Sequence, residues 1–548
     1  MNKKIPVIYN ADFGTLGWSP EVWEPDWKGH FTKAGVVNFV KILADSGVDV
    51  LLMNPNSQVA WYPSKVWPTI LDGYTRDEVK NLESAAWNHR IYECYEEDPL
   101  YYVRYILNAY LDLTDENVDW MQEIKKACKE YGIELRASIR MNDMHYVAPG
   151  LNNYLVAGIY ENNHLKGTNH TGRTKEYYMA LDYSKEGVRD YYFALIKELV
   201  EDYECMGIEL DWTRNAACME YPASEEDIMV INDWLSMIKG YLNRKGVANN
   251  CTYTFGMRVL SNVSMYKSIG IDVVENGKNK TLDYICPSNF VSCTWDFDYE
   301  RLRKLTDYNC DIYGSTEIIC NKLPCKPDFS SHYKTEALEK TNLGNLRDIT
   351  GSSAYFRGNI AALIANDVDA IEVYNFFIAD ARHLTGITSD YSLMKNVSEI
   401  SFLFGKTKFY TLTTAGGGCN YPPFEMAAAA PVVIPSFQHH RFDVSMLDEA
   451  ESNYELKVQI VIKKEDAGHG FGVSFNGSPV NYAAVETDKL LLPSRPFASH
   501  IDENIGCEYS FGSIDIVKGW NTIDVFNDKK DGNLLVLSVE AGVIFKGV

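Results

Sequence analysis

Residues 121–140 read MQEIKKACKEYGIELRASIR, and this stretch decides the fold class. The apolar residues of its first half recur at the spacing of one helix face: Met121, Ile124, Cys128 and Tyr131. Gly132 is a residue type that commonly ends a helix, and an apolar run follows at once over residues 133–139. A helix that leads directly into a buried strand is the repeating unit of a parallel sheet, so we expect a β/α protein.

The same alternation of strands and helices continues on both sides of this stretch. We expect strands over residues 6–10, 48–54, 133–139, 208–212, 252–257, 282–286, 311–317 and 370–376. Helices with one apolar face separate several of them; their apolar positions include Val36, Phe39, Val40, Leu43, Val188, Tyr192, Leu195, Leu199, Ile231, Trp234, Leu235, Ile360, Leu363 and Ile364. Eight strands separated by helices are typical of an α/β fold of the TIM-barrel type, a (β/α)8 barrel, which we predict for residues 1–415. A doubly wound sheet is the alternative, but residues 10–17 lack the glycine-rich phosphate turn of that fold.

A second kind of pattern begins at Gly416, the first of three consecutive glycines. Apolar residues alternate with polar ones over residues 456–462, and Asn476-Gly477 is a hairpin turn signal. Residues 521–526 read as a further strand. We therefore predict a C-terminal β-sandwich accessory domain over residues 416–548, which either packs against the barrel or also binds sugar.

Composition and charge exclude some classes of partner. The formal net charge of -23 repels phosphate backbones, so we expect no nucleic-acid partner. No apolar run is long enough for a signal peptide or a membrane span, so we expect a cytoplasmic protein with no membrane partner. Aromatic residues make up 13% of the chain, and their rings either fill the core or stack on sugars.

The cysteines do not suggest a metal centre. The 12 cysteines are scattered, and Cys320 with Cys325 stands too isolated to imply zinc. We expect reduced, mostly buried thiols and neither a metal nor another cofactor.

The polar residues at the predicted strand ends form the candidate site, because barrel enzymes assemble their chemistry at the carboxyl ends of their strands. They are Asp12, Asn54, Asn56, Arg140, Asn142, Asp143, His145, Glu209, Asp211, Arg214, Arg258, Glu317, Glu372 and Asn375. So many ionisable groups are expensive to bury unless they are paired or used. We interpret them as an active site; the alternative is a salt-bridge lattice that closes the barrel, for example Asp211 with Arg214.

Two kinds of chemistry are open to these residues. Glu209 and Asp211 share one face of a strand, and Asp211 with Glu317 or Glu372 could supply the two carboxylates that a glycosidase needs. His145 is the one histidine at a predicted strand end, where Asp143 could set its tautomer.

Three arginines at successive strand ends suggest an anionic substrate: Arg140, Arg214 and Arg258. Convergent guanidinium groups hold a carboxylate bidentately, so an acidic sugar such as a sialic or uronic acid would fit. The alternative is that each arginine neutralises a neighbouring Asp or Glu.

Three motifs carry a family resemblance that covers nearly the whole chain. Residues 140–145 (RMNDMH), 207–214 (GIELDWTR) and 371–376 (IEVYNF) resemble bacterial glycosyl hydrolase-like, family 10-like barrels. Within that group the arrangement is similar to glycoside hydrolase family 156, the inverting exo-sialidases. The same signatures occur in relatives of unassigned specificity, so the resemblance supports a glycosidase more firmly than a sialidase.

The resemblance also implies roles for individual residues. An acidic residue after the first strand and a histidine after the third stand at the reaction centre, which matches Asp12 and His145. Arginines on the third and fourth strands hold the sialic acid, which matches Arg140 and Arg214. The resemblance does not match further binding residues; we assign Asn375 to substrate binding from its place at the end of the eighth predicted strand.

The sequence therefore predicts a glycoside hydrolase, exo-acting on a terminal sugar. The predicted catalytic residues are Asp12, His145 and Asp211. The predicted contacts to the carbohydrate substrate are Arg140, Asn142, Asp143, Glu209, Arg214, Arg258, Glu317, Glu372 and Asn375.

Other readings stay open. One is a glycosidase for a neutral or uronic sugar that uses Asp211 with Glu317. A metal-dependent hydrolase could use Asp12, Asp143 and His145, although no HxxxH or HxH pairing accompanies them. A non-catalytic carbohydrate-binding protein is a further class. Residues 62–113, rich in Tyr and Trp, would either roof the site or form the contact of a homodimer.

Overall fold

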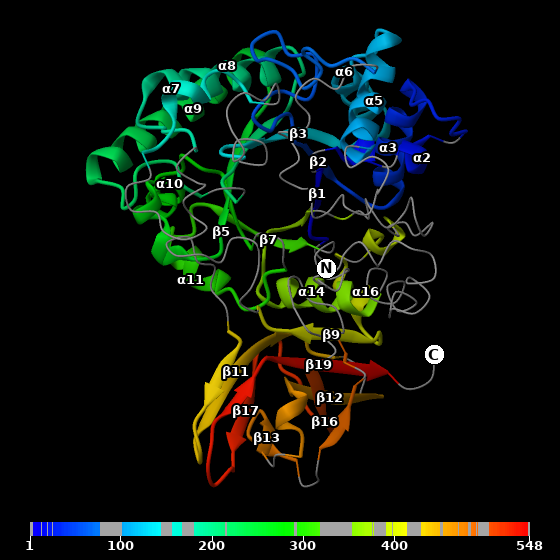
Figure 1. Cartoon of the computed structure of the whole chain (residues 1–548), viewed down its shortest axis with the longest axis vertical. Helices are drawn as coiled ribbons and strands as arrows, with labels where there is room; N and C mark the ends of the chain where they lie inside the picture. Colours follow the sequence, from blue (N-terminus) through cyan, green and yellow to red (C-terminus); the bar gives the residue numbers. More distant parts are fainter. Residues whose placement is uncertain are drawn as a thin grey trace.

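The computed structural model describes residues 4–11, 14–18, 20–24, 26–76, 101–143, 156–166, 180–213, 216–289, 293–317, 353–374, 376, 391–396, 398–413, 429–449, 453–468, 471–480, 484–488, 490–491 and 504–545. Eight parallel strands close into a barrel in chain order. They are β1 (Val7–Ala11), β2 (Val50–Met53), β3 (Glu134–Arg140), β4 (Gly207–Asp211), β5 (Thr254–Leu260), β6 (Tyr284–Ser288), β7 (Asp311–Glu317) and β8 (Ala370–Tyr374). The predicted fold class is confirmed, and Figure 1 shows the barrel and its helices above the C-terminal sheets.

The helices of the described part of the chain surround the barrel. They are α1 (Thr15–Trp18), α2 (Pro20–Trp23), α3 (Lys33–Asp45), α5 (Tyr101–Asp115), α6 (Trp120–Tyr131), α7 (Tyr160–Asn163), α8 (Glu186–Glu201), α9 (Glu225–Asn249), α10 (Val273–Lys278), α11 (Tyr299–Leu305), α14 (Ser353–Ala365) and α16 (Ile400–Leu403). Short 3-10 helices are η3 (Val263–Met265), η4 (Lys267–Ile269), η8 (Tyr391–Met394) and η9 (Lys464–Asp466). Within these ranges no helix is long and apolar enough to cross a membrane.

The ends of α6 explain why the chain turns from helix to strand where it does. The Asp119 carboxylate accepts from the backbone N–H groups of Met121 and Gln122, which satisfies two donors of the first turn. At the other end Gly132 adopts φ 73°, a left-handed conformation that favours glycine. The chain then enters β3 two residues later, as the sequence predicts.

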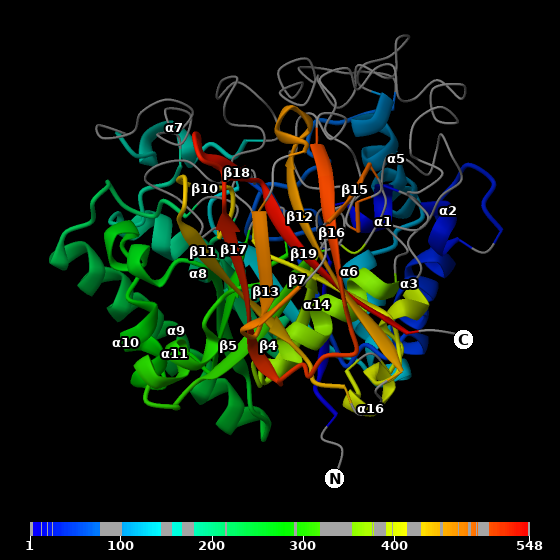
Figure 2. The ribbon, with the colours of Figure 1, turned by 90° about the horizontal axis from the view of Figure 1, so that it is seen from below.

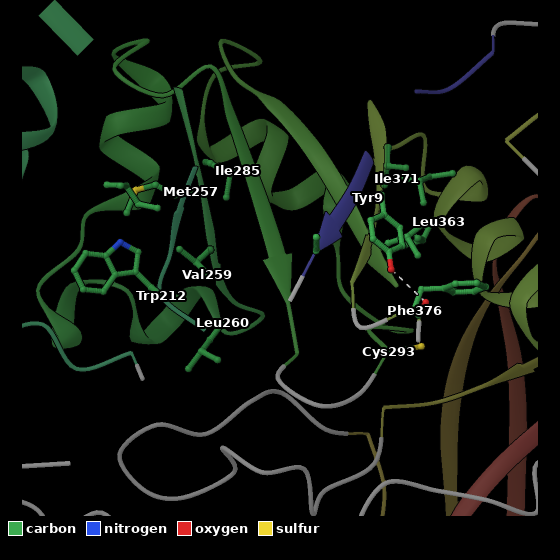
Figure 3. Close-up of a cluster of buried hydrophobic side chains, with 14 of the residues drawn as sticks. Tyr9, Trp212, Met257, Val259, Leu260, Ile285, Cys293, Leu363, Ile371 and Phe376 are labelled. Carbon is green, nitrogen blue, oxygen red and sulfur yellow. Dashed lines mark hydrogen bonds between the residues drawn. The ribbon is translucent and has the colours of Figure 1, made fainter. Parts of the chain in front are cut away.

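The two faces of the barrel strands differ in character. Outward side chains pack against the helices in one large apolar core, part of which Figure 3 shows around Met257, Val259 and Ile371. In the same view the Tyr9 hydroxyl donates to the backbone oxygen of Phe376 over 3.3 Å. Inside the barrel, the amino-terminal half is filled by a smaller cluster: Ile8, Val50, Leu52, Tyr284, Cys286, Tyr313 and Ala370. The carboxyl-terminal half is polar and holds the candidate site.

The C-terminal part of the chain forms antiparallel sheets that pack into a sandwich. Its strands are β9 (Lys408–Thr411), β10 (Val432–Ile434), β11 (His439–Met446), β12 (Tyr454–Lys463), β13 (Phe471–Phe475), β14 (Ser478–Pro479), β15 (Val485–Thr487), β16 (Asn504–Gly512), β17 (Gly519–Asn527), β18 (Leu534–Val536) and β19 (Ser538–Phe545). The sheets have the orders β11-β17-β13-β14, β15-β16-β12-β19-β9 and β10-β18. The predicted turn at Asn476-Gly477 is confirmed, because both residues have positive φ and connect the paired strands β13 and β14. Figure 2 shows these strands in front of the barrel.

The barrel and the sheets meet along α14. Its Gly358 lies so close to β9 that an added Cβ would overlap the carbonyl oxygen of Phe409. Near the end of the same helix, the Asn366 amide donates to the Ser445 hydroxyl of β11 over 2.8 Å. The strand β9 pairs with β19 but precedes Gly416, where we predict the second domain to begin. The sheets therefore include residues from before that predicted domain boundary.

Candidate active site

The structure describes seven of the twelve predicted site residues completely. They are Arg140, Asn142, Asp143, Glu209, Asp211, Arg258 and Glu372, none more than 1% exposed. For Glu317 the structure describes the place at the end of β7 but not the side chain. The other predicted site residues lie outside the described residues: Asp12, His145, Arg214 and Asn375.

The barrel register brings the described residues together. Arg140 pairs with Asp211 across β3 and β4, and Asp211 pairs with Arg258 across β4 and β5. Because side chains alternate along a strand, Glu209 and Asp211 both face the interior. The predicted convergence of these residues at the carboxyl ends of the strands is therefore present for the part that the structure describes.

Arg258 is the centre of one group of contacts. Its guanidinium lies 3.3 Å from an oxygen of Asp211 and 3.3 Å from an oxygen of Glu372. It also donates to the hydroxyls of Thr213 over 3.1 Å and Ser288 over 2.8 Å. The guanidinium carbon stands 3.8 Å from the centre of the Tyr374 ring, a cation–π contact. Two carboxylates, two hydroxyls and an aromatic ring thus hold this buried cation in place.

Arg140 is the centre of a second group, joined to the first through a shared ring. Its Nη1 donates to Asp143 Oδ2 over 2.8 Å, and its Nε donates to Asn54 Oδ1 over 3.3 Å. Its Nη2 donates over 3.5 Å to the hydroxyl of Tyr374. The ring of the same tyrosine makes the cation–π contact with Arg258. The Arg140 guanidinium also lies 4.9 Å from the Trp61 ring. Both described arginines therefore contact carboxylates, as the salt-bridge alternative predicts for them.

Glu209 is surrounded by neutral donors instead of a cation. Its Oε1 accepts from Ser138 over 2.7 Å and from Asn10 over 3.2 Å, and its Oε2 accepts from the Tyr284 hydroxyl over 3.0 Å. The Asn10 amide also donates to Glu372 over 2.9 Å, so one amide joins two carboxylates. Burial, followed by the charges of nearby carboxylates, raises the pKa of Glu209 well above its usual range.

Asp211 and Asn142 fix the chain beyond their strands. Asp211 Oδ1 accepts from the backbone N–H of Thr213 over 2.8 Å and from its hydroxyl over 2.6 Å. The Asn142 amide donates to the backbone oxygens of Ala217 over 2.5 Å and Leu181 over 3.3 Å, and accepts from the N–H of Leu181 over 3.0 Å. These side chains hold together the segments that leave β3 and β4.

Several residues of this network were not predicted from the sequence as site residues: Asn10, Ser138, Thr213, Tyr284 and Ser288. A signal existed for two of them. Asn10 precedes Asp12 by two positions and Ser138 precedes Arg140 by two, so the alternation of a strand places them one layer deeper on the same face.

The described residues show no metal centre. Among them, no group of three or more His, Cys, Asp or Glu side chains is arranged to hold a metal ion. The buried carboxylates and arginines instead form a layer that ion pairs and hydrogen bonds hold together. Such a layer can position the chain that follows each strand, which is where the predicted reacting residues stand in the sequence.

Known structures that resemble this chain have low sequence identity to it. No protein-family model and no curated protein matches the chain. A Paenibacillus cycloisomaltooligosaccharide glucanotransferase is 7% identical, with a TM-score of 0.31 over 99% of this chain and 57% of that one. A maltogenic alpha-amylase of Thermotoga neapolitana is 12% identical, with a TM-score of 0.34 over 98% of this chain and 99% of that one. An Anoxybacillus alpha-amylase is 10% identical, with a TM-score of 0.36 over 96% and 99%. These TM-scores lie below 0.5, so the function is inferred from the chain's own residues.

Proposed function

We propose that this chain is a glycoside hydrolase that removes a terminal sugar at the carboxyl-terminal mouth of its barrel. The observation that supports this most is the buried layer in which Arg140 and Arg258 contact three carboxylates directly beneath that mouth. Burying these charges is expensive, and a fold that needed only closure could use apolar side chains there. Preorganised charge under a barrel mouth is the arrangement that barrel enzymes use for catalysis.

The reacting groups in this proposal are Asp12 and His145. Each follows a strand that contributes a residue to the buried layer. On β1, Asn10 donates to Glu372; on β3, Arg140 donates to Asp143. One of the two groups acts as the base that deprotonates the attacking water, and the other assists departure of the leaving group. Direct attack by water inverts the configuration at the anomeric carbon.

A substrate carboxylate, if the sugar is a sialic acid, would be held by Arg214. Of the three arginines in the predicted clamp, Arg140 and Arg258 already contact carboxylates of the chain. We therefore assign these two to positioning the strand ends, and assign the substrate carboxylate to Arg214.

Turnover of a panel of fluorogenic glycosides that includes a sialoside tests the proposal. Wild-type protein is expected to hydrolyse at least one glycoside, and Asp12→Asn and His145→Gln are each expected to lower kcat by about 10²-fold or more. His439→Gln is the matched control, because His439 is exposed at the start of β11 in the sheets. Binding of sugars without turnover of any would contradict the proposal and favour a carbohydrate-binding protein.

The engagement of both described arginines favours a second candidate, a glycosidase for a neutral sugar with Asp211 and Glu317 as its carboxylate pair. Asp211 stands at the end of β4, with Thr213 fixing its orientation. Proton NMR of the first-formed anomer separates the two, because inversion supports the Asp12 and His145 reading. Retention, together with activity on neutral glycosides and none on the sialoside, would overturn it.

A further inference from the structure

Glu209 is a buried carboxyl group to which the proposed reaction assigns no role. It lies at the middle of β4, is 0% exposed, and accepts hydrogen bonds from an amide, a hydroxyl and a phenol: Asn10, Ser138 and Tyr284. Among the residues that the structure describes, no cation lies within ion-pair distance of its carboxyl group.

Across the part of the chain that the structure describes, the charge around Glu209 does not balance if every carboxyl group is ionised. Arg258 is shared by Asp211 and Glu372, each at 3.3 Å, so it offsets one of their two charges. Glu209 would add a third negative charge to a space without water contact, where such repulsion is strong. The neighbouring Arg140 is matched by Asp143, and Arg136 by Glu134.

The groups that face Glu209 come from the strands around it. The charged or titratable ones are Asp211 of β4, Arg136 of β3, Arg258 of β5, Tyr284 and Cys286 of β6, Tyr313 of β7 and Glu372 of β8. Burial raises the pKa of Tyr284 and of Cys286 well above their usual ranges, so both stay neutral: neither adds a negative charge, and neither supplies a cation.

We propose that Glu209 is an uncharged carboxylic acid in the folded protein at neutral pH, so that it adds no further negative charge beside Asp211 and Glu372, which share Arg258. The hydrogen bonds are compatible with this state: Oε1 accepts from Ser138 and Asn10, while a proton on Oε2 can be donated to the Tyr284 oxygen. Within the described residues, deprotonation of Glu209 would leave two uncompensated negative charges among Glu209, Asp211 and Glu372 on β4 and β8. The inference concerns the resting protein and does not depend on the reaction.

The proposal has a defined thermodynamic signature. In the unfolded chain a glutamate loses its proton at a pH of about 4.3. Above that pH the folded state holds one proton more than the unfolded state, so stability falls as pH rises until the folded-state pKa is passed. Each pH unit in this window lowers the folding equilibrium constant tenfold, about 1.4 kcal/mol. Glu209→Gln keeps the neutral hydrogen-bond pattern and removes the proton, so it removes this dependence.

Urea unfolding of wild-type protein and of Glu209→Gln, from about pH 5.5 to about pH 7.5, tests the proposal. The ratio of the wild-type to the variant folding constant is expected to fall about tenfold per pH unit. The exposed Glu226→Gln of α9 serves as a surface control. A pH-independent ratio for Glu209→Gln, or a fall of the same size for Glu226→Gln, would overturn the proposal.

Infrared spectroscopy of the wild-type protein gives a readout that needs no folded variant. A neutral Glu209 predicts the carbonyl band of a protonated carboxyl group at neutral pH in the folded protein, which disappears when urea exposes the group. Absence of that band in the folded protein would overturn the proposal as well.

Discussion

At the scale of single residues, Arg258 shows how one buried cation can organise a barrel end. It contacts Asp211, Glu372 and the face of Tyr374, and the same Tyr374 hydroxyl accepts from Arg140. A guanidinium suits this place because its planar form stacks on a ring while its edges donate to oxygens. A lysine could make the ion pairs but not the stack.

Replacing Arg258 is expected to destabilise the fold strongly. Arg258→Met removes the cation and leaves Asp211 and Glu372 buried without it, so the free energy of unfolding should fall by about 3–5 kcal/mol. Urea denaturation measures the change. In Arg258→Met/Glu372→Gln, part of the loss should be recovered, because one of the two uncompensated charges is removed as well.

A surface arginine gives the control for this prediction. Arg441 forms a two-pronged pair with Asp524 on an exposed strand of the sheets, at 2.9 and 3.3 Å. Arg441→Met is expected to have no clear effect, because solvent screens such a pair. If both methionine variants lose little stability, the buried layer does not have the strength that its geometry indicates.

The residue scale is also where prediction from the sequence is least complete. The alternation of β3 and β4 places Arg140, Glu209 and Asp211 on the inner face, and the structure agrees. The partner of each arginine depends on the register between strands that are distant in sequence. Glu372 lies 114 positions after Arg258, so the contact between them could not be predicted from the spacing of residues. Asn10, whose amide donates to both Glu209 and Glu372, is uncharged, so no charge pattern in the sequence marks it as a site residue.

At the scale of elements, the contact of α14 with β9 depends on one glycine. A Cβ at Gly358 would overlap the backbone of Phe409, which cannot move without displacing β9 from the sheet. Gly358→Ala is therefore expected to lower the free energy of unfolding by about 1–3 kcal/mol or more. Thermal or urea unfolding of the purified protein measures this.

The helix α8 supplies the matched control. Outside its own helix, no described residue lies within 4 Å of a Cβ added at Gly187, so Gly187→Ala should be neutral or stabilise the helix by about 0.5–1 kcal/mol. Equal effects of the two substitutions would mean that α14 and β9 can separate at little cost.

The elements themselves were predictable to a much greater degree than their partners. The eight barrel strands lie within a few residues of the expected ranges, because continuous apolar runs between amphipathic helices are a local signal. The place of β9 is not a local property. Residues 408–411 become a sheet strand by pairing with residues 540–543, and nothing in the four residues alone indicates that partner.

At the scale of the whole molecule, a buried ion pair lies where the barrel sequence ends and the sheets begin. Lys408 of β9 lies 2.5 Å from Glu449, both side chains 0% exposed, and its ammonium also donates to the backbone oxygens of Leu403 and Lys406. Burial lowers the pKa of Lys408 and raises that of Glu449, so each charge depends on the other. Because β9 packs on α14 while pairing with β19, this pair supports both parts of the molecule.

Lys408→Met is expected to lower the unfolding temperature of the barrel and of the sheets together. The variant leaves Glu449 buried without its cation, a loss of about 3–5 kcal/mol, and the shared β9 passes that loss to both parts. Differential scanning calorimetry should show one transition in wild-type protein and one transition at lower temperature in the variant. Lys463→Met, which removes a partly exposed charge from β12, should leave the transition where it is. Two separated transitions, with only one of them shifted by Lys408→Met, would show instead that barrel and sheets unfold independently and that their contact along α14 contributes little to stability.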